Sequence, residues 1–224
     1  MTKAIFLDFY GTVVHEDDAY IDMLCKRIAS TASVPAVSSE IGRFWWKRFC
    51  GKCAEAYGER FQTQRALEIE ALHETLASVQ SPENPDELAG ILFEHWMKPG
   101  LFEDSEAFFR QTQLPVYILS NIDRSDLIAA TRSCGLALEG DRLITSEDVR
   151  SYKPRQEMFA EALRRSGVKP HEALHVGDSL ANDVGGARMA GIPVVWINRK
   201  QKRLPPDCRP DRVISRLTEL LEPQ

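Results

Sequence analysis

The chain has 224 residues, a formal net charge of −5 at pH 7 and a sequence pI near 5.6. This length allows one large domain or two modest ones, and the acidic balance argues against a nucleic-acid-binding protein, which is usually basic. No apolar run approaches the roughly 20 residues that cross a bilayer, and the amino terminus lacks a basic segment followed by an apolar one. We therefore expect a cytoplasmic protein that binds neither nucleic acid nor membrane; the sequence leaves its oligomeric state open.

The five cysteines are an odd number in a chain without a secretory signal, so we expect reduced thiols. Cys50 and Cys53 form the one close pair, and such a pair occurs in redox sites and in half of a zinc site. Neither a second pair nor a nearby histidine cluster completes a tetrahedral zinc set. The pair is therefore interpreted as small helix residues one turn apart.

The first element is a short apolar strand, Ile5 to Leu7, of the kind that is buried in a parallel sheet. Asp8 follows where the strand ends, and Gly11 allows the backbone to turn sharply. Ligands of open α/β sheets bind at the carboxyl ends of the strands, so we expect Asp8 at the mouth of a site. Considered alone, this carboxylate is a solvated strand end, a metal ligand or a nucleophile.

Residues 15–98 are predicted to form a bundle of four helices. Apolar side chains recur at helical spacing in four segments, and breaks rich in proline and serine separate them. The segments cover residues 21–28, 41–49, 62–79 and 88–96. The tryptophans and phenylalanines among them are expected to form the core of the bundle.

From residue 99 onward, strands and helices alternate. The predicted strands are 116–119, 143–146, 173–176, 194–197 and 213–214. The predicted helices cover residues 127–131, 158–163, 182–190 and 216–221. Such alternation predicts a parallel sheet with right-handed crossovers, to which the amino-terminal strand is expected to belong. We therefore expect an α/β protein with a sheet core, residues 1–14 and 99–224, and an inserted helical bundle, residues 15–98.

Four polar residues follow the ends of predicted strands or lie in the loops after them: Asp8, Ser120, Lys153 and Asp178. If the strands are parallel, these positions share one rim of the sheet. Each has a simpler explanation by itself, as a helix cap, a solvated lysine or a turn residue. A single site explains all four together, and we therefore predict one.

The chemistry of this rim is coherent with nucleophilic catalysis by Asp8. A nucleophilic carboxylate needs a nearby cation to stay ionised and to neutralise an incoming anion, and Lys153 can supply that charge. Ser120, Thr12 and the amide of Asn121 would donate hydrogen bonds to anionic oxygens. A small anionic molecule is therefore the expected substrate.

Two further carboxylates point to a metal ion at the same rim. Asp178 and Asp183 can join Asp8 around a hard cation such as Mg²⁺, which prefers carboxylate and water ligands. Two carboxylates alone would be a weak indication of a metal site. Three that converge on one rim are a stronger one.

These residues resemble the haloacid dehalogenase-like hydrolase superfamily, and the resemblance covers the whole alternating domain. Residues 8–12, Asp-Phe-Tyr-Gly-Thr, are similar to its first motif, and residues 119–121, Leu-Ser-Asn, to its second. Residues 153–154, Lys-Pro, resemble the third motif, and residues 177–183, Gly-Asp-Ser-Leu-Ala-Asn-Asp, the fourth. The resemblance implies a Rossmann-like sheet, a helical cap that covers the site and selects the substrate, and Asp8 as the nucleophile.

The resemblance also implies roles for single residues. Mg²⁺ would be held by Asp8, Asp178 and the carbonyl of Tyr10. Asp183 would help directly or through water, and it is a candidate base for the water that resolves the covalent intermediate. The predicted substrate contacts are Tyr10, Gly11 and Asn121.

Tyr10 departs from the family's phosphatases, which usually carry a second aspartate there to protonate the leaving group. Tyrosine has a pKa near 10 and is a poor base at neutral pH. A tyrosine at this place is similar to the 2-haloacid dehalogenase branch, where the aspartate attacks carbon, halide leaves and no metal is used. The fourth motif instead resembles the metal-binding phosphatases, because the dehalogenases carry Ser and Asn where the metal-binding acids would be. Without a cation, Asp178 would repel Asp8.

We therefore favour a Mg²⁺-dependent phosphatase of a small phosphorylated metabolite, with a 2-haloacid dehalogenase as the alternative. Two further alternatives are a phosphonate hydrolase, which would need a cap lysine such as Lys47 or Lys52 to form an imine, and a binding protein that keeps the phosphate site but turns over poorly. These lysines, with Arg43 and Arg48, are interpreted mainly as a solvated helix face. His175 is interpreted as a packed strand residue rather than a catalytic base.

Overall fold

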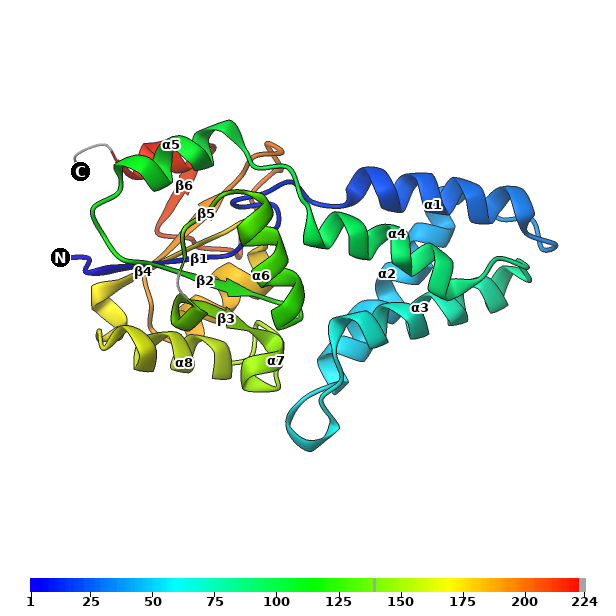
Figure 1. Cartoon of the computed structure of the whole chain (residues 1–224), viewed down its shortest axis with the longest axis horizontal. Helices are drawn as coiled ribbons and strands as arrows, with labels where there is room; N and C mark the ends of the chain where they lie inside the picture. The colour runs from blue at the N-terminus through cyan, green and yellow to red at the C-terminus, as the bar shows by residue number, and fades with distance from the viewer. Residues whose placement is uncertain (139, 222–224) are drawn as a thin grey trace.

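The computed structural model describes residues 1–138 and 140–221, which form a sheet domain and a helical bundle (Figure 1). Six parallel strands form one sheet in the order β3-β2-β1-β4-β5-β6. The strands are β1 (Ala4–Leu7), β2 (Val116–Ser120), β3 (Leu143–Thr145), β4 (Ala173–Gly177), β5 (Val194–Ile197) and β6 (Arg212–Ile214). The bundle is inserted between β1 and β2 and stands beside the sheet. The predicted α/β class, with a parallel sheet and a helical insertion, is confirmed.

The first strand, β1, lies inside the sheet between β2 and β4, because its side chains are apolar on both faces and all of them are buried. Ile5 and Leu7 belong to a hydrophobic core on one face, whereas Ala4 and Phe6 belong to the core on the other. The first face is covered by α5 (Glu103–Gln111), α6 (Arg124–Ser133) and η5 (Leu217–Leu220). The second is covered by α8 (Glu157–Ser166), η4 (Leu180–Gly185) and α9 (Gly186–Met189). This layering puts the carboxyl ends of the strands at one open rim.

Four helices make up the bundle: α1 (Asp18–Thr31), α2 (Ser38–Glu55), α3 (Gln64–Val79) and α4 (Pro85–Met97). Buried leucine and isoleucine side chains form much of their contact surface. Trp45 and Trp96 are buried as predicted, but Phe44 and Trp46 are 38% and 62% exposed. The expectation that all the aromatic residues pack in the bundle core is therefore wrong in part, because one side of α2 faces away from its neighbours.

Several short elements complete the chain: η1 (Gly58–Arg60), η2 (Gly140–Arg142), α7 (Ser146–Val149) and η3 (Pro170–Glu172). No helix was predicted where α5 lies; its first turn is acidic, and Phe108 is its fully buried apolar residue. The predicted helix 182–190 is a π-helical turn, η4, followed by α9, and the predicted helix 216–221 is the short 3₁₀ turn η5. In η4, the N–H groups of Asp183 and Val184 both donate to the Ser179 carbonyl, which widens the turn.

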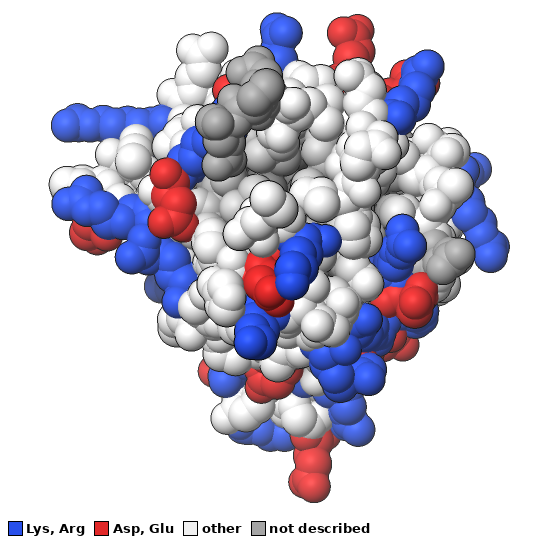
Figure 2. Space-filling view, turned by 90° about the vertical axis from the view of Figure 1, so that its left-hand side faces the viewer, with Lys and Arg blue, Asp and Glu red and all other residues white. Residues whose placement is uncertain are grey.

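Charge is spread over the end of the sheet domain that lies opposite the bundle. Figure 2 shows Lys and Arg side chains interspersed with Asp and Glu over this face. The face therefore lacks the single-sign basic stripe that nucleic-acid-binding proteins carry. Among the described residues, no helix has both the length and the apolar composition that a membrane crossing requires.

Candidate active site

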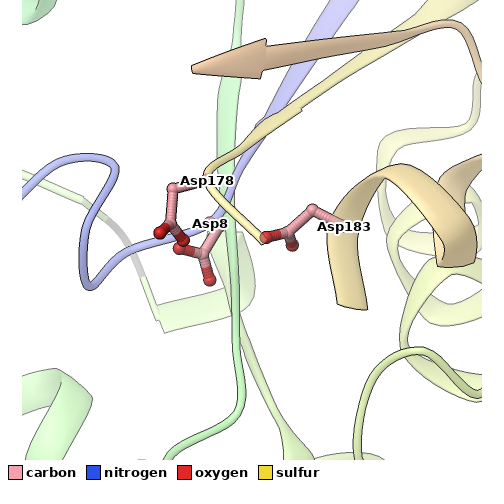
Figure 3. Close-up of side chains that lie close together, drawn as sticks. All are labelled: Asp8, Asp178 and Asp183. Carbon is pink, nitrogen blue, oxygen red and sulfur yellow. The ribbon is translucent and has the colours of Figure 1, made fainter. Parts of the chain in front are cut away.

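Three carboxylates converge at the carboxyl end of the sheet (Figure 3). One oxygen atom from each of Asp8, Asp178 and Asp183 lies within 4.8 Å of the others. Asp8 directly follows β1 and Asp178 directly follows β4, whereas Asp183 comes from the π-helical turn η4 and points back toward them. Asp8 is 8% exposed and Asp183 is 1% exposed. The parallel sheet thus brings the three predicted metal-binding side chains together.

Lys153 is the cation of this carboxylate cluster. Its buried Nζ donates to Asp8 Oδ1 at 2.8 Å, to Asp183 Oδ1 at 2.7 Å and to the Leu119 carbonyl at 2.8 Å. The side chain of Asn121 holds the backbone of Lys153: Oδ1 accepts its N–H at 2.7 Å, and Nδ2 donates to its carbonyl at 3.1 Å. The amide of Asn121 is therefore engaged in placing Lys153.

The close carboxylates perturb one another's proton affinity. Burial raises the pKa of Asp8 to about 6, although Lys153 opposes the shift. Burial and the neighbouring charge of Asp8 raise the pKa of Asp178 to about 8. Burial would also raise the pKa of Asp183, but Lys153 and His175 lower it to about 2. The cluster thus carries more negative charge than Lys153 neutralises.

Two buried oxygen atoms of predicted site residues have no hydrogen-bond partner among the described residues: Asp8 Oδ2 and Thr12 Oγ1. Asp8 lines the cavity at the carboxylates, whereas Thr12 is fully buried and is not among the residues that line it. Asp8 Oδ1 is already bonded to Lys153, so Oδ2 is the free acceptor of this carboxylate. An unpartnered carboxylate oxygen close to two further carboxylates suits a hard cation with oxygen ligands. Ser120, 2% exposed, lines the same site and adds a hydroxyl.

The loop after β1 brings Gly11 close to the carboxylates. The glycine has a φ of +83°, and a Cβ atom there would lie 2.9 Å from Asp178 Cγ. A side chain at this position would therefore displace Asp178. Two cavities adjoin the carboxylates. Gly11 lines the smaller one, of about 350 Å³, whereas Tyr10 lines the larger one, which lies between the sheet and the bundle.

His175 was missed as a part of the site. It is fully buried in β4, as expected, but its Nε2 also lies 3.0 Å from Asp183 Oδ1. Burial lowers the pKa of His175, so the ring is neutral and can donate this hydrogen bond. Gly177 allows the approach of Asp183, because a Cβ atom there would lie 2.2 Å from Asp183 Cγ. In the sequence, the position of His175 two residues before Gly177 was the one indication that it lies near the site.

A cavity of about 900 Å³ lies between the sheet and the bundle. The sheet side contributes Asp8, Ser120, Asn121, Lys153, Asp178 and Asp183. The bundle side contributes Asp17, Trp45, Trp46, Phe49, Glu68 and Trp96. The carboxylate cluster is therefore open to a small molecule that also touches the bundle.

The basic residues of α2 do not line this cavity. Arg43 and Lys47 are exposed, Arg48 pairs with Glu74, and Lys52 lies 2.9 Å from Glu74. Their interpretation as a solvated face agrees with these positions. Among the described residues of the bundle that line the cavity, none is a lysine or an arginine.

Cys50 and Cys53 line the cavity as free thiols, and the other three cysteines are free as well. Burial raises the pKa of both thiols. A thiol with a raised pKa is a poor nucleophile and a poor metal ligand. The pair therefore acts as small residues of the cavity wall.

The loop after β2 also attaches the bundle to the sheet domain. Asp123 accepts the N–H of Gln64 at 2.7 Å and that of Arg65 at 3.1 Å, and so satisfies the amino terminus of α3. The guanidinium of Arg65 pairs with Asp126 at 2.6 Å. The Arg155 guanidinium of the sheet domain also lies 3.7 Å from the ring centre of Tyr57. These contacts, which the sequence did not reveal, set the position of the bundle over the site.

Comparisons with known proteins place the chain among hydrolases. A family model described as haloacid dehalogenase-like hydrolase matches residues 2–191. The phosphoserine phosphatase of Thermus thermophilus is 34% identical over 147 residues, which cover 62% of this chain and 57% of that protein. The (S)-2-haloacid dehalogenase of Pseudomonas fluorescens is 32% identical over 108 residues, which cover 48% of this chain and 47% of that protein. The chain thus spans about half the length of these curated relatives.

Among solved structures, the L-2-haloacid dehalogenase RSc1362 matches with a TM-score of 0.80 and 22% identity over 98% of this chain and 97% of that one. At this identity, the match establishes a shared fold. The family model covers most of the chain and includes all four sequence motifs. The chain therefore belongs to the haloacid dehalogenase-like hydrolase family.

Proposed function

We propose that the protein is a Mg²⁺-dependent phosphatase of small phosphate monoesters, with Asp8 as its nucleophile. The observation that carries this proposal is the buried, unpartnered Oδ2 of Asp8 beside the carboxylates of Asp178 and Asp183. A site with three carboxylates and one lysine is short of positive charge, and a divalent cation would supply it. Without a metal ion, the negative charges of Asp178 and Asp8 would repel each other.

The oxygen-only donor set suits Mg²⁺. Asp8, Asp178 and the carbonyl of Tyr10 would hold the ion, with Asp183 in an outer position, because both oxygens of Asp183 already accept hydrogen bonds. When bound, the ion neutralises the carboxylates and the oxygens of the phosphoryl group. Lys153 spends its three donors on Asp8, Asp183 and the Leu119 carbonyl, so its contribution to the substrate is its positive charge.

The residues of the chain divide the reaction between them. A carboxylate oxygen of Asp8 attacks phosphorus, the bond to the leaving oxygen breaks, and the leaving oxygen takes a proton from solvent. Water then attacks the phosphorus of the aspartyl phosphate, gives up a proton to solvent, and restores the carboxylate. Lys153 keeps Asp8 ionised and faces the transferred group. We assign the hydroxyl of Ser120, which lines the cavity, to a phosphoryl oxygen, and we keep Thr12 as a second donor on the sequence-based prediction. Asn121 holds Lys153 in place.

Asp183 serves this mechanism best as a positioning residue. Its Oδ1 accepts from Lys153 and lies against His175, and its Oδ2 accepts the N–H of Ser179 at 3.1 Å. Its pKa, lowered to about 2, makes it a weak base. We therefore assign Asp183 the task of orienting Lys153, and its role as base for the water stays a sequence-based prediction.

A 2-haloacid dehalogenase is the second candidate, and Tyr10 is the observation that favours it. Its substrate carries a carboxylate beside the reacting carbon, which needs a cation or several donors in addition to those at Asp8. Among the described residues, the bundle side of the cavity offers no lysine or arginine for that group. The phosphonate hydrolase is disfavoured because Lys52 is paired with Glu70 and Glu74 outside the cavity.

The test is the release of phosphate from p-nitrophenyl phosphate with and without Mg²⁺. We expect hydrolysis that needs the ion, stops with a chelator and disappears in the Asp8→Asn variant. Asp22→Asn, at an exposed position of α1, is the matched control and keeps full activity. Release of chloride from 2-chloropropionate in the presence of chelator would instead support the dehalogenase. If neither reaction occurs, stabilisation by Mg²⁺ with a phosphate mimic would point to a binding protein.

A further inference from the structure

The bundle side of the cavity has a composition that the chemistry at Asp8 does not explain. Glu68, on α3, lines the cavity yet is 5% exposed. Its Oε1 accepts the indole N–H of Trp45 at 2.6 Å, and no donor among the described residues bonds its Oε2. This oxygen is not among the buried side-chain atoms that lack a partner, so it remains accessible from the cavity. The structure therefore leaves room for a ligand group at Oε2.

Neighbouring side chains present acceptors and negative charge to the same space. Asp17 lines the cavity and accepts the indole N–H of Trp96 at 2.8 Å, as Glu68 does from Trp45. Gln64, one turn before Glu68 on α3, has a buried Oε1 without a partner among the described residues. The group that fits here is rich in hydrogen-bond donors. An ammonium has three donors and no acceptor.

Aromatic rings complete the surroundings of Glu68. Trp45, Trp46 and Phe49 line the same part of the cavity from α2. The faces of such rings attract a cation when it lies within about 6 Å. Burial raises the pKa of Glu68 to about 8, and the charge of Asp17 adds to this shift. An ammonium group beside Glu68 would oppose the shift and favour the ionised carboxylate. The basic residues that line the cavity, Lys153, Arg155, Lys200 and Lys202, all belong to the sheet domain. On the bundle side, the carboxylates and aromatic rings together suit a cation better than an anion.

Asp8 and Glu68 line one and the same cavity, of about 900 Å³. The N–H of Gln64 is held by Asp123, which lies three residues after Ser120 in the loop of the catalytic rim. Glu68 is one helical turn further along α3, a rise of about 5.4 Å. A phosphate at Asp8 and a second group at Glu68 can thus belong to the same ligand.

We infer that the Glu68 end of the cavity binds an ammonium group, so that the substrate is a phosphate monoester that carries a primary amine. The inference rests on the proposed phosphatase function for the other end of that substrate. It assigns Glu68 the choice of substrate, with Asp17, Gln64 and the rings of α2 as further contacts. Under this inference, the helical bundle recognises the amine of the substrate, whereas the reaction takes place at Asp8.

The test compares two ligands that differ by one group, 4-(aminomethyl)phenylphosphonate and 4-ethylphenylphosphonate. Calorimetry in the presence of Mg²⁺ measures the affinity of each for the wild-type protein. We expect the amine to bind about tenfold or more tightly, the effect of one charge-assisted hydrogen bond. Equal affinities, or tighter binding of the ethyl compound, would overturn the inference. The wild-type comparison needs no variant and so does not depend on whether a variant folds.

Glu68→Gln removes the charge while keeping the size of the side chain and an acceptor for Trp45. We expect it to bring the ratio of the two affinities close to one. Glu70→Gln, at an exposed position two residues along the same helix, is the matched control and leaves the ratio unchanged. A ratio that survives in Glu68→Gln shows that the residue does not recognise the amine and overturns the assignment.

The corresponding esters separate this inference from the proposed function. The ratio of kcat/KM for 4-(aminomethyl)phenyl phosphate and 4-ethylphenyl phosphate should follow the ratio of affinities and fall in Glu68→Gln. If no phosphate is released from either ester or from p-nitrophenyl phosphate, the phosphatase proposal fails. The calorimetric ratio then still decides whether the cavity binds an ammonium group.

Discussion

The hydroxyl of Tyr10 donates a 2.5 Å hydrogen bond to the backbone carbonyl of Trp96, near the end of α4. This bond joins the loop that follows β1 to the last helix of the bundle. Burial raises the pKa of Tyr10 well above its ordinary value, so the hydroxyl keeps its proton. Tyr10 therefore ties the bundle to the sheet domain, and we expect that it does not carry a proton to the leaving group.

Tyr10→Phe is accordingly expected to change kcat on aryl phosphates by no more than about twofold, a small effect beside the hundredfold or more that loss of a general acid causes. Loss of the hydrogen bond should cost about 1 kcal/mol and lower the Tm by about 2–4 °C. Steady-state kinetics on aryl phosphates with leaving groups of different pKa, together with thermal unfolding, measure both effects. Tyr20→Phe, on the outside of α1, is the control. A hundredfold loss that grows with the pKa of the leaving group would identify Tyr10 as the acid.

Without Mg²⁺, the protein is expected to lose stability as the pH rises from about 4 to about 8. The pKa values of Asp8 and Asp178 are raised from 3.8 to about 6 and about 8, so the folded state holds protons that the unfolded state has released. Such a group stabilises the fold below its unfolded pKa, and this contribution disappears as the pH rises through its folded pKa. Asp183, whose pKa is lowered, affects stability only below about pH 4. Thermal unfolding across this pH range measures the trend.

Addition of Mg²⁺ should remove most of that decline, because a bound cation favours the ionised carboxylates. Asp178→Asn should flatten the decline without Mg²⁺ and should abolish the stabilisation by the ion. An unchanged decline in this variant would show that other groups cause it. Stabilisation by Mg²⁺ that persists in Asp178→Asn would place the ion elsewhere.

The rim of the site could be predicted from the sequence, because each strand is an apolar run with a clear end. Asp8 and Asp178 directly follow such runs, and parallel pairing brings the two ends together. Ser120 closes its own strand and follows the same rule. The fold class was predictable for the same reason, since alternation of strands and helices restricts the topology.

Contacts that depend on how distant segments pack could not be predicted in this way. His175 reaches Asp183 because the π-helical turn η4 rotates that carboxylate back toward β4, and helical periodicity does not show such a turn. Asp123 binds the amino terminus of α3, which lies 58 or more residues away along the chain. The side of α2 that faces the cavity likewise follows from the docking of the bundle. For this reason, the sequence did not show that Trp46 and Phe49 of α2 line the cavity.

Lys153→Met is expected to abolish hydrolysis and to lower the free energy of unfolding at pH 7 by about 3–5 kcal/mol, the usual cost of leaving a buried charge without its partner. Asp8 and Asp183 would both lose their cation, and the Leu119 carbonyl would lose its donor. Urea unfolding at pH 7 and pH 5 measures the change. Part of the loss should be recovered at pH 5, because the pKa of Asp183 would rise once Lys153 is removed. Lys52→Met is the control, since an exposed pair contributes about 1 kcal/mol at most.

Asp123→Ala tests whether the attachment of the bundle matters for substrate binding. Asp123, 4% exposed, accepts two N–H groups at the start of α3, and the positive end of the helix dipole favours its charge. Removing this cap should cost about 1–2 kcal/mol. Because α3 carries Gln64 and Glu68 into the cavity, we also expect KM to rise more than kcat falls. Asp86→Ala, an exposed aspartate in the first turn of α4, should leave KM unchanged. Equal effects of Asp123→Ala on kcat and kcat/KM, with KM unchanged, would show instead that the loop acts on the chemistry at Asp8 rather than on the position of the bundle.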